Sequence, residues 1–347
     1  MSAQQGESKQ RFDWIDAAKG IGILLVVAGH VMGEGGMSFS GSDVVRGYIY
    51  SFHMSLFFII GGILLGYSLS RSELDTEYLG KKTRSLARRL LIPFFIWSVI
   101  YYLLGHGDLN DLTSLEKWFA STITFRGWAP IWFLAALFWS EVFALLIVFF
   151  SKGQARWILF WAGVILLLSC VAWWFYDPEG SAPLYLRYLE ISVFRGLVCL
   201  FFVLVGYLVS SILLKGEKLG VCIAVFLASA TVSVLVYLLI GGDWNLHTFK
   251  VSNIIAFVLL GLLGSTAVIY LCKTICALMK SRVLVGIGQE TLGVMCIHYK
   301  PFPFMNYATD ICAFLSLAGF AAFLLSFTFV FACSFLGTKL LKRFAIF

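Results

Sequence analysis

Charged residues are scarce in this chain. Asp, Glu, Lys and Arg make up 13% of its 347 residues, whereas 60% of the residues are hydrophobic and 17% are aromatic. A soluble core of this size cannot hide so much apolar surface, so the composition excludes an ordinary globular protein and indicates a membrane protein.

Signals for secretion, metal binding or nucleic-acid binding are also missing. The first 14 residues are polar and contain no small-residue cleavage site, so we expect 1–14 to be a cytoplasmic tail and the first apolar segment to be retained. The eight cysteines lie in or beside apolar runs without CxxC pairs or metal-ligand spacing, as small packing residues do. A net charge of +7 is typical of basic cytoplasmic loops, so we expect no nucleic-acid partner.

Apolar runs recur from residue 15 almost to the C-terminus. Crossing the ~30 Å hydrocarbon core takes about 20 residues of helix, and these runs are too long for barrel strands of ~10 residues. We predict an all-α polytopic protein of about ten transmembrane helices, with one transmembrane domain over 15–343 and no separate soluble domain. The predicted spans are 15–36, 48–69, 89–105, 131–150, 157–175, 192–213, 219–240, 251–272, 283–305 and 313–337.

Lys and Arg are unevenly distributed between the predicted loops. With both termini in the cytoplasm, all but seven of the 26 fall on the inner side, which satisfies the positive-inside rule. The longest outer connection, about 106–130, has apolar residues at helical spacing and predicts an amphipathic helix. Its apolar residues are Leu112, Leu115, Trp118 and Phe119. His106 and His247 fall on predicted outer loops.

The first predicted span carries Asp16, Lys19 and His30 on one side of the helix. At ~100° per residue, the step from Lys19 to His30 returns to within about 20° of the same face. His53 and His298 reach a similar depth in the outer half of their spans. Ionisable residues inside a membrane usually mark a site, and neutral imidazole accepts a proton near neutral pH. This pattern indicates a catalytic site, with hydrogen-bonded packing histidines as the alternative, and without an accompanying carboxylate or HxxxH pair we expect no metal.

A basic run precedes the third predicted span, and two interpretations of it stand. It either anchors the chain to anionic lipid headgroups or binds a phosphate-rich donor, because arginine matches phosphate oxygens bidentately. Its members are Lys81, Lys82, Arg84, Arg88 and Arg89. Glu141 and Arg195 lie inside other spans and are further candidates.

Several segments resemble motifs of the membrane acyltransferase-3 family, in the family's order. Residues 12–23, closing on His30, resemble its first helix, especially that of the fucose-acetylase-like branch. Residues 52–62 resemble its second-helix motif, and 88–94 resemble its basic stretch before the third helix. Residues 132–134 resemble a fourth-helix motif, and 293–298 resemble a late helix that ends in histidine.

The resemblance implies a membrane O-acetyltransferase of a bacterial inner membrane that acts in polysaccharide O-acetylation. Acetyl-CoA from the cytoplasm is the expected donor, and a hydroxyl of a sugar, glycan or lipid-linked saccharide is the expected acceptor. His30 is the expected general base. The whole set of expected site residues is His30, His53, His298, Asp16 and Lys19 for catalysis, Lys82, Arg84, Arg88 and Arg89 for the donor, and Arg46, Arg126, Trp132, Glu141 and Arg195 for the acceptor or the developing charge.

A different class of function also explains buried histidines. In a carrier or flippase for a lipid-linked sugar, the polar side of the first helix would line a path and no bond would be broken. That alternative leaves the basic run and the ordered motifs without a role, and binding of acetyl-CoA discriminates between the two.

Overall fold

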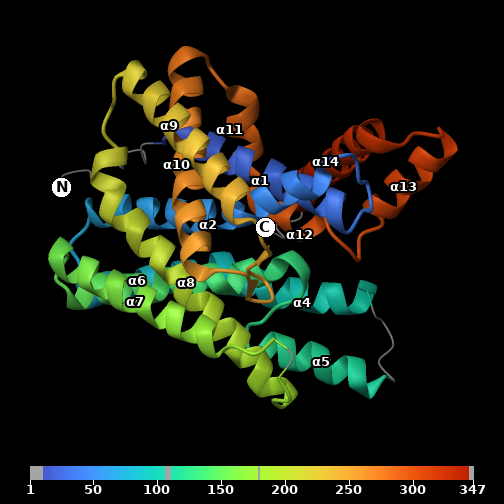
Figure 1. The fold of residues 1–347 in the computed structure, drawn as a ribbon. Coiled ribbons are helices and arrows are strands. Elements are labelled where there is room, and N and C mark those ends of the chain that lie inside the picture. The colour runs from blue at the N-terminus through green and yellow to red at the C-terminus, as the bar shows by residue number, and fades with distance from the viewer. Residues whose placement is uncertain (1–10, 106–110, 179, 344–347) are drawn as a thin grey trace.

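The computed structural model describes residues 11–105, 111–178 and 180–343. The described chain is almost entirely helical, apart from one two-stranded antiparallel hairpin (Figure 1). Its elements are α1 (Asp13–Gly33), α2 (Ser42–Leu69), α3 (Thr76–Leu86), η1 (Ala87–Leu91), α4 (Ile92–Gly105), α5 (Leu112–Ile123), η2 (Ala129–Ile131), α6 (Trp132–Phe150), α7 (Ala155–Phe175), α8 (Leu184–Leu213), α9 (Leu219–Ile240), β1 (Trp244–Asn245), β2 (Lys250–Val251), α10 (Ile254–Leu278), α11 (Arg282–Gln289), α12 (Thr291–Ile297), α13 (Phe304–Phe314) and α14 (Gly319–Arg343).

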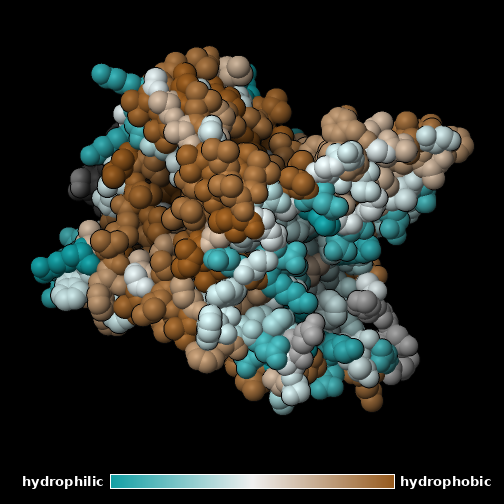
Figure 2. Space-filling model, viewed as in Figure 1, coloured by the Kyte–Doolittle hydropathy of each residue, from teal (hydrophilic) through white to brown (hydrophobic). Residues whose placement is uncertain are grey.

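Nine helical segments in the described part of the chain are long and apolar enough to cross a membrane. Large apolar side chains are exposed along several of them, including Leu167, Leu239 and Leu336. Figure 2 shows apolar residues over the left and upper centre of the visible face, with hydrophilic residues at its left edge and across its lower right. Exposed apolar surface of this extent fits a lipid-facing exterior, so the chain is an all-α, multi-pass membrane protein.

The predicted ninth span, 283–305, is not one helix. The chain forms α11, breaks at Glu290, forms α12, and turns before α13 begins at Phe304. Pro301 and Pro303 lack the N–H groups that a continuing helix needs, which accounts for the turn. The predicted tenth span, 313–337, also differs, because α14 covers Gly319–Arg343. The predicted amphipathic helix between the third and fourth spans is confirmed as α5.

Helix α2 forms the centre of the bundle. Of its most apolar stretch, 89% is buried inside the protein. It packs backbone to backbone against α8, where a Cβ on Gly62 would lie 2.0 Å from the carbonyl oxygen of Val203 and one on Gly206 would lie 2.1 Å from that of Ile59. Small residues at such crossings let membrane helices approach closely. The central helix that carries His53 is thereby fixed.

Candidate active site

Two histidines from distant parts of the sequence form a hydrogen-bonded pair. The Nδ1 atom of His30, near the end of α1, lies 2.7 Å from Nε2 of His298, which follows α12. Their rings are nearly parallel, at an interplanar angle of 4°. His298 is 1% exposed, so its orientation is fixed by the protein around it.

The backbone around His298 determines which nitrogen carries its proton. Nδ1 of His298 lies 2.9 Å from the carbonyl oxygen of Val294 and 3.1 Å from that of Met295. Carbonyl oxygens only accept, so Nδ1 must carry hydrogen and Nε2 of the neutral ring must accept. His30 therefore donates from Nδ1. Its own Nε2 is left with a lone pair that can take up a proton.

His30 and His53 line the same small cavity. Its volume is about 60 Å³, which is enough to hold ordered water. The Nδ1 atom of His53 lies 2.8 Å from the carbonyl oxygen of Ile49, one turn earlier in α2. The same donor rule puts hydrogen on Nδ1 of His53 and a lone pair on its Nε2. Two histidines with basic Nε2 atoms thus line one cavity.

A third wall of this cavity comes from the connection between α9 and α10. His247 and Trp244 both line the cavity, and Nε2 of His247 lies 3.4 Å from the carbonyl oxygen of Gly127. Burial, together with the positive charges of Arg195 and Arg126, lowers the pKa of His247 to about 3. This histidine is therefore neutral at physiological pH.

Arg195 anchors the loops around the cavity. Its guanidinium donates to the carbonyl oxygens of His247 at 3.0 Å, Phe125 at 2.8 Å and Arg126 at 2.7 Å. It also lies over the ring of Trp132, 4.7 Å from the centroid, and Trp132 stacks on His247. A buried arginine whose two Nη atoms donate to three carbonyls is a structural support for these loops, although its Nε–H has no partner among the described residues.

Trp244 presents a buried donor that the protein leaves unused. Its side chain is 3% exposed, and the indole Nε1–H has no hydrogen-bond partner among the described residues. An unpaired buried donor costs about 1–3 kcal/mol, and such groups are uncommon in folded proteins. A donor left unused on a residue that lines the same cavity as His30 and His53 is suited to an oxygen of a bound ligand.

The alignment of the two paired histidines depends on a close crossing of α1 and α11. A Cβ on Gly20 would lie 2.4 Å from the carbonyl oxygen of Leu284, and one on Gly288 would lie 1.8 Å from that of Asp16. Neither position has room for a side chain. The crossing fixes where α12 starts, and so where His298 meets α1.

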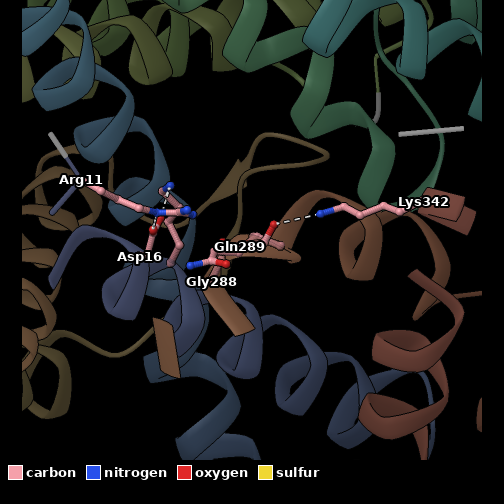
Figure 3. A network of polar contacts seen from close by, with 7 residues as sticks. Arg11, Asp16, Gly288, Gln289 and Lys342 are labelled. Atoms are coloured by element: carbon pink, nitrogen blue, oxygen red, sulfur yellow. Dashed lines mark hydrogen bonds and ion pairs between the residues drawn. The ribbon is translucent and has the colours of Figure 1, made fainter. Parts of the chain in front are cut away.

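Polar contacts also lie at this end of α1 and α11 (Figure 3). Arg11 donates from Nε to the carboxylate of Asp16 at 2.7 Å. Across the crossing, Lys342 of α14 donates to the carbonyl oxygen of Gln289 at 3.5 Å. Helices α1, α11 and α14 are joined at this end, which the positive-inside rule assigns to the cytoplasm.

A family model described as an acyltransferase domain matches residues 12–339. The chain belongs to the acyltransferase-3 family. No curated protein and no solved structure matches it. Because the match spans nearly the whole chain, the described helices form the acyltransferase domain itself, and the protein is a membrane acyltransferase.

Two of the expected catalytic residues of this acyltransferase lie apart from the histidines. Asp16 and Lys19 form an ion pair of 2.9 Å at the start of α1. Lys19 precedes His30 by eleven residues, or about 17 Å at ~1.5 Å per residue. The three residues share one side of the helix, but Lys19 and His30 are too far apart to act at one site. Asp16 and Lys19 hold the end of the helix, whereas His30 meets His53 and His298.

The basic run surrounds a buried carboxylate. Glu141 is 4% exposed, and its Oε2 lies 3.3 Å from Nη2 of Arg89, which belongs to η1, a π-helical turn. Lys82 donates to the hydroxyl of Ser68 at 3.2 Å. Glu141 therefore pairs with the basic run, away from the histidine cavity, and does not lie where an acceptor would meet His30. Arg84 and Arg88 are exposed.

Of the other residues expected to contact the acceptor, one lines the histidine cavity and the others do not. Trp132 lines the histidine cavity. Arg46 pairs with Asp43 at 3.2 Å near the start of α2, and the guanidinium of Arg126 lies 4.3 Å from the ring centroid of Tyr188. Burial lowers the pKa of Arg126. Of the cations expected to touch the acceptor, none is among the residues that line the histidine cavity.

His247 was expected on an outer loop and belongs to the site instead. It lies in the hairpin connection, which folds inward because Trp244, Leu246 and Phe249 are buried. A histidine among closely spaced large apolar residues in a loop is the sequence signal that could have identified it. No group of three or more His, Cys, Asp or Glu side chains in the described ranges could hold a metal ion.

A larger cavity of about 720 Å³ lies between α6, α7 and α8. Apolar residues make up most of its lining, including the exposed Phe143, Phe150 and Trp161. None of the histidines lines it. Its position and lining suit lipid chains, so size alone does not identify the reaction site.

Proposed function

We propose that this acyltransferase moves an acetyl group from acetyl-CoA to a hydroxyl of a sugar, free or lipid-linked, in a bacterial inner membrane. The observation that supports a histidine base is the pair formed by His30 and His298. In that pair the proton positions follow from backbone carbonyls, and Nε2 of His30 is free to accept. The fucose-acetylase-like motifs support acetyl as the group and a sugar as the acceptor.

The reaction follows from this arrangement. Nε2 of His30 takes the proton of the acceptor hydroxyl as the oxygen attacks the thioester carbonyl, because an alcohol is too weak an acid to ionise first. The tetrahedral intermediate collapses, the C–S bond breaks, and the proton on His30 passes to the departing thiolate. His298 receives the hydrogen bond from Nδ1 throughout and stabilises the transient imidazolium.

Trp244 is the proposed donor for the intermediate. Negative charge develops on the former carbonyl oxygen, and a preorganised donor in a dry site is worth a factor of about 10²–10³ in kcat. Neutral His53 has only a lone pair at Nε2, so it suits the acceptor hydroxyl and not the oxyanion. This assignment replaces the outer arginines, whose donors are used elsewhere or lie outside the cavity.

The basic run is the proposed site for the phosphates of the coenzyme. Arg84, Arg88 and Arg89 lie on exposed parts of α3 and η1, where arginine forks can reach phosphate oxygens. We expect Arg84→Ala and Arg88→Ala to raise the KM for acetyl-CoA about tenfold and to leave kcat within twofold. Arg156→Ala, an exposed cation at the start of α7, is the matched control and should change neither.

The direct test is acetyl transfer from radiolabelled acetyl-CoA by the purified protein in detergent, with extracted bacterial glycolipids as acceptor. Label should enter glycan with the natural protein and not with His30→Ala, at equal protein and equal melting temperature. If the natural protein neither binds acetyl-CoA nor transfers label, the carrier for a lipid-linked sugar replaces this proposal.

A further inference from the structure

A second polar cavity lies beside the histidine cavity, at the end of the bundle where α4 finishes and α13 begins. Its volume is about 380 Å³, within the roughly 300–1,000 Å³ of small-molecule sites. Three of its wall residues are Tyr102 of α4, Trp128 before η2 and Tyr299 after α12. Lys300 and Asn306 are exposed and contribute polar groups to its lining.

Tyr299 lines this cavity and contacts both paired histidines. Its ring lies 4.7 Å from the ring of His30 and 6.2 Å from that of His298, centroid to centroid. The segment that forms the other wall is shared too, because Trp128 lines this cavity and Pro130 lines the histidine cavity. A ligand held against Tyr299 is therefore next to the general base.

The walls are held in place before any ligand arrives. The hydroxyl of Tyr101, another wall residue, donates to the carbonyl oxygen of Cys296 at 3.0 Å. Tyr102 packs against Trp118 of α5, with ring centroids 5.1 Å apart. These contacts fix aromatic faces around the space. Rigid aromatic faces with an amide and an ammonium nearby suit a ring that has apolar faces and hydroxyl edges.

We propose that this second cavity, which we name the Tyr299 cavity, is the binding site for the sugar ring of the acceptor. The inference rests on the proposed function and adds to it where the acceptor binds. The histidine cavity holds only the reacting atoms, because its volume of about 60 Å³ is too small for a sugar. The ring lies against Tyr299, Tyr102 or Trp128, and Asn306 and Lys300 bond to its hydroxyls. One hydroxyl extends past Tyr299 to Nε2 of His30.

Blocking the cavity from its exposed rim tests this without disturbing the core. Asn306→Trp places a large ring in the lining, and Tyr307→Trp adds a similar ring one position along α13, where the natural Tyr is 54% exposed and does not line the cavity. Binding is measured by saturation-transfer NMR with p-nitrophenyl glycosides of glucose, galactose, N-acetylglucosamine and fucose. Transfer is measured as kcat/KM for the best of these acceptors, and as KM for acetyl-CoA.

We expect Asn306→Trp to lower glycoside binding and acceptor kcat/KM at least tenfold, with the KM for acetyl-CoA within twofold. Tyr307→Trp should change none of these values. If the natural protein transfers acetyl but Asn306→Trp keeps its acceptor kcat/KM and glycoside binding within twofold, the assignment of this cavity is wrong and the acetyl-transfer proposal stands. If glycosides bind to the natural protein and not to Asn306→Trp, yet no acetyl is transferred, the cavity is a sugar site and the proposed reaction is wrong.

Discussion

The hydrogen bond between His30 and His298 makes a prediction that a mutant cycle can test. A general base is worth a factor of about 10²–10⁴, which is about 2.7–5.5 kcal/mol of the barrier, so His30→Ala should lose that much. His298 acts only through His30. Its hydrogen bond to the charged His30 imidazolium should lower the barrier by about 1.5–3 kcal/mol, as hydrogen bonds to charged groups do. That converts to a loss of roughly 10- to 150-fold for His298→Ala.

The double variant separates a shared role from two independent ones. Once His30 is removed, His298 has no base to orient, so the double variant should be no slower than His30→Ala, a coupling of about 1.5–3 kcal/mol. His298→Gln should recover part of the rate, because the side-chain carbonyl can accept from Nδ1 of His30. The assay is label transfer to glycolipid over long incubations, with melting temperatures in detergent as the control for folding. Losses that add in the double variant would refute the pair.

Three further predictions concern the cavity and the crossing. Gly288→Val should lower the melting temperature in detergent and the folded yield, because it costs about 1–3 kcal/mol or more of stability. Gly286→Val is the control and should be tolerated, because a Cβ there meets nothing within 4 Å. Trp244→Phe should lower kcat about 100- to 1,000-fold with little change in either KM. Trp173→Phe, whose indole N–H donates to a backbone carbonyl at 2.7 Å, should affect stability only, and equal kcat losses would contradict the donor role. In the folded protein the pKa of His247 is about 3, below its usual value near 6.5. Between these two pH values the unfolded state binds a proton that the folded state does not. Stability is therefore lost as pH falls below 6.5, by at most about 1.4 kcal/mol per unit. His247→Phe should show a shallower decline in melting temperature between pH 6.5 and 4, and parallel declines would show that His247 is protonated in the folded protein.

The fold class could be predicted from the sequence because bilayer physics leaves little choice. A continuous apolar run must be a helix to satisfy its own backbone hydrogen bonds, and nine of the ten predicted spans correspond to single long helical segments. The prediction of the ninth span was wrong. Its hydropathy is that of a transmembrane span, but a helix cannot continue through Pro301 and Pro303. Helix α14 likewise begins later than hydropathy predicts, at Gly319, where the backbone has a φ of 58°.

The sequence also determined which histidines to examine, since depth along a helix follows from counting residues, and His30, His53 and His298 came out at one level. Only the tertiary structure decided which of them meet. Lys19 and His30 share one side of α1, but a rise of ~1.5 Å per residue already separates them by about 17 Å, and the structure shows that Lys19 pairs with Asp16. His247 and Trp244 reach the cavity from the connection between α9 and α10, and Glu141 pairs with Arg89. These contacts join residues far apart in the chain, so the sequence alone does not predict them. Tautomers likewise depend on local carbonyl geometry, which residue identity does not specify.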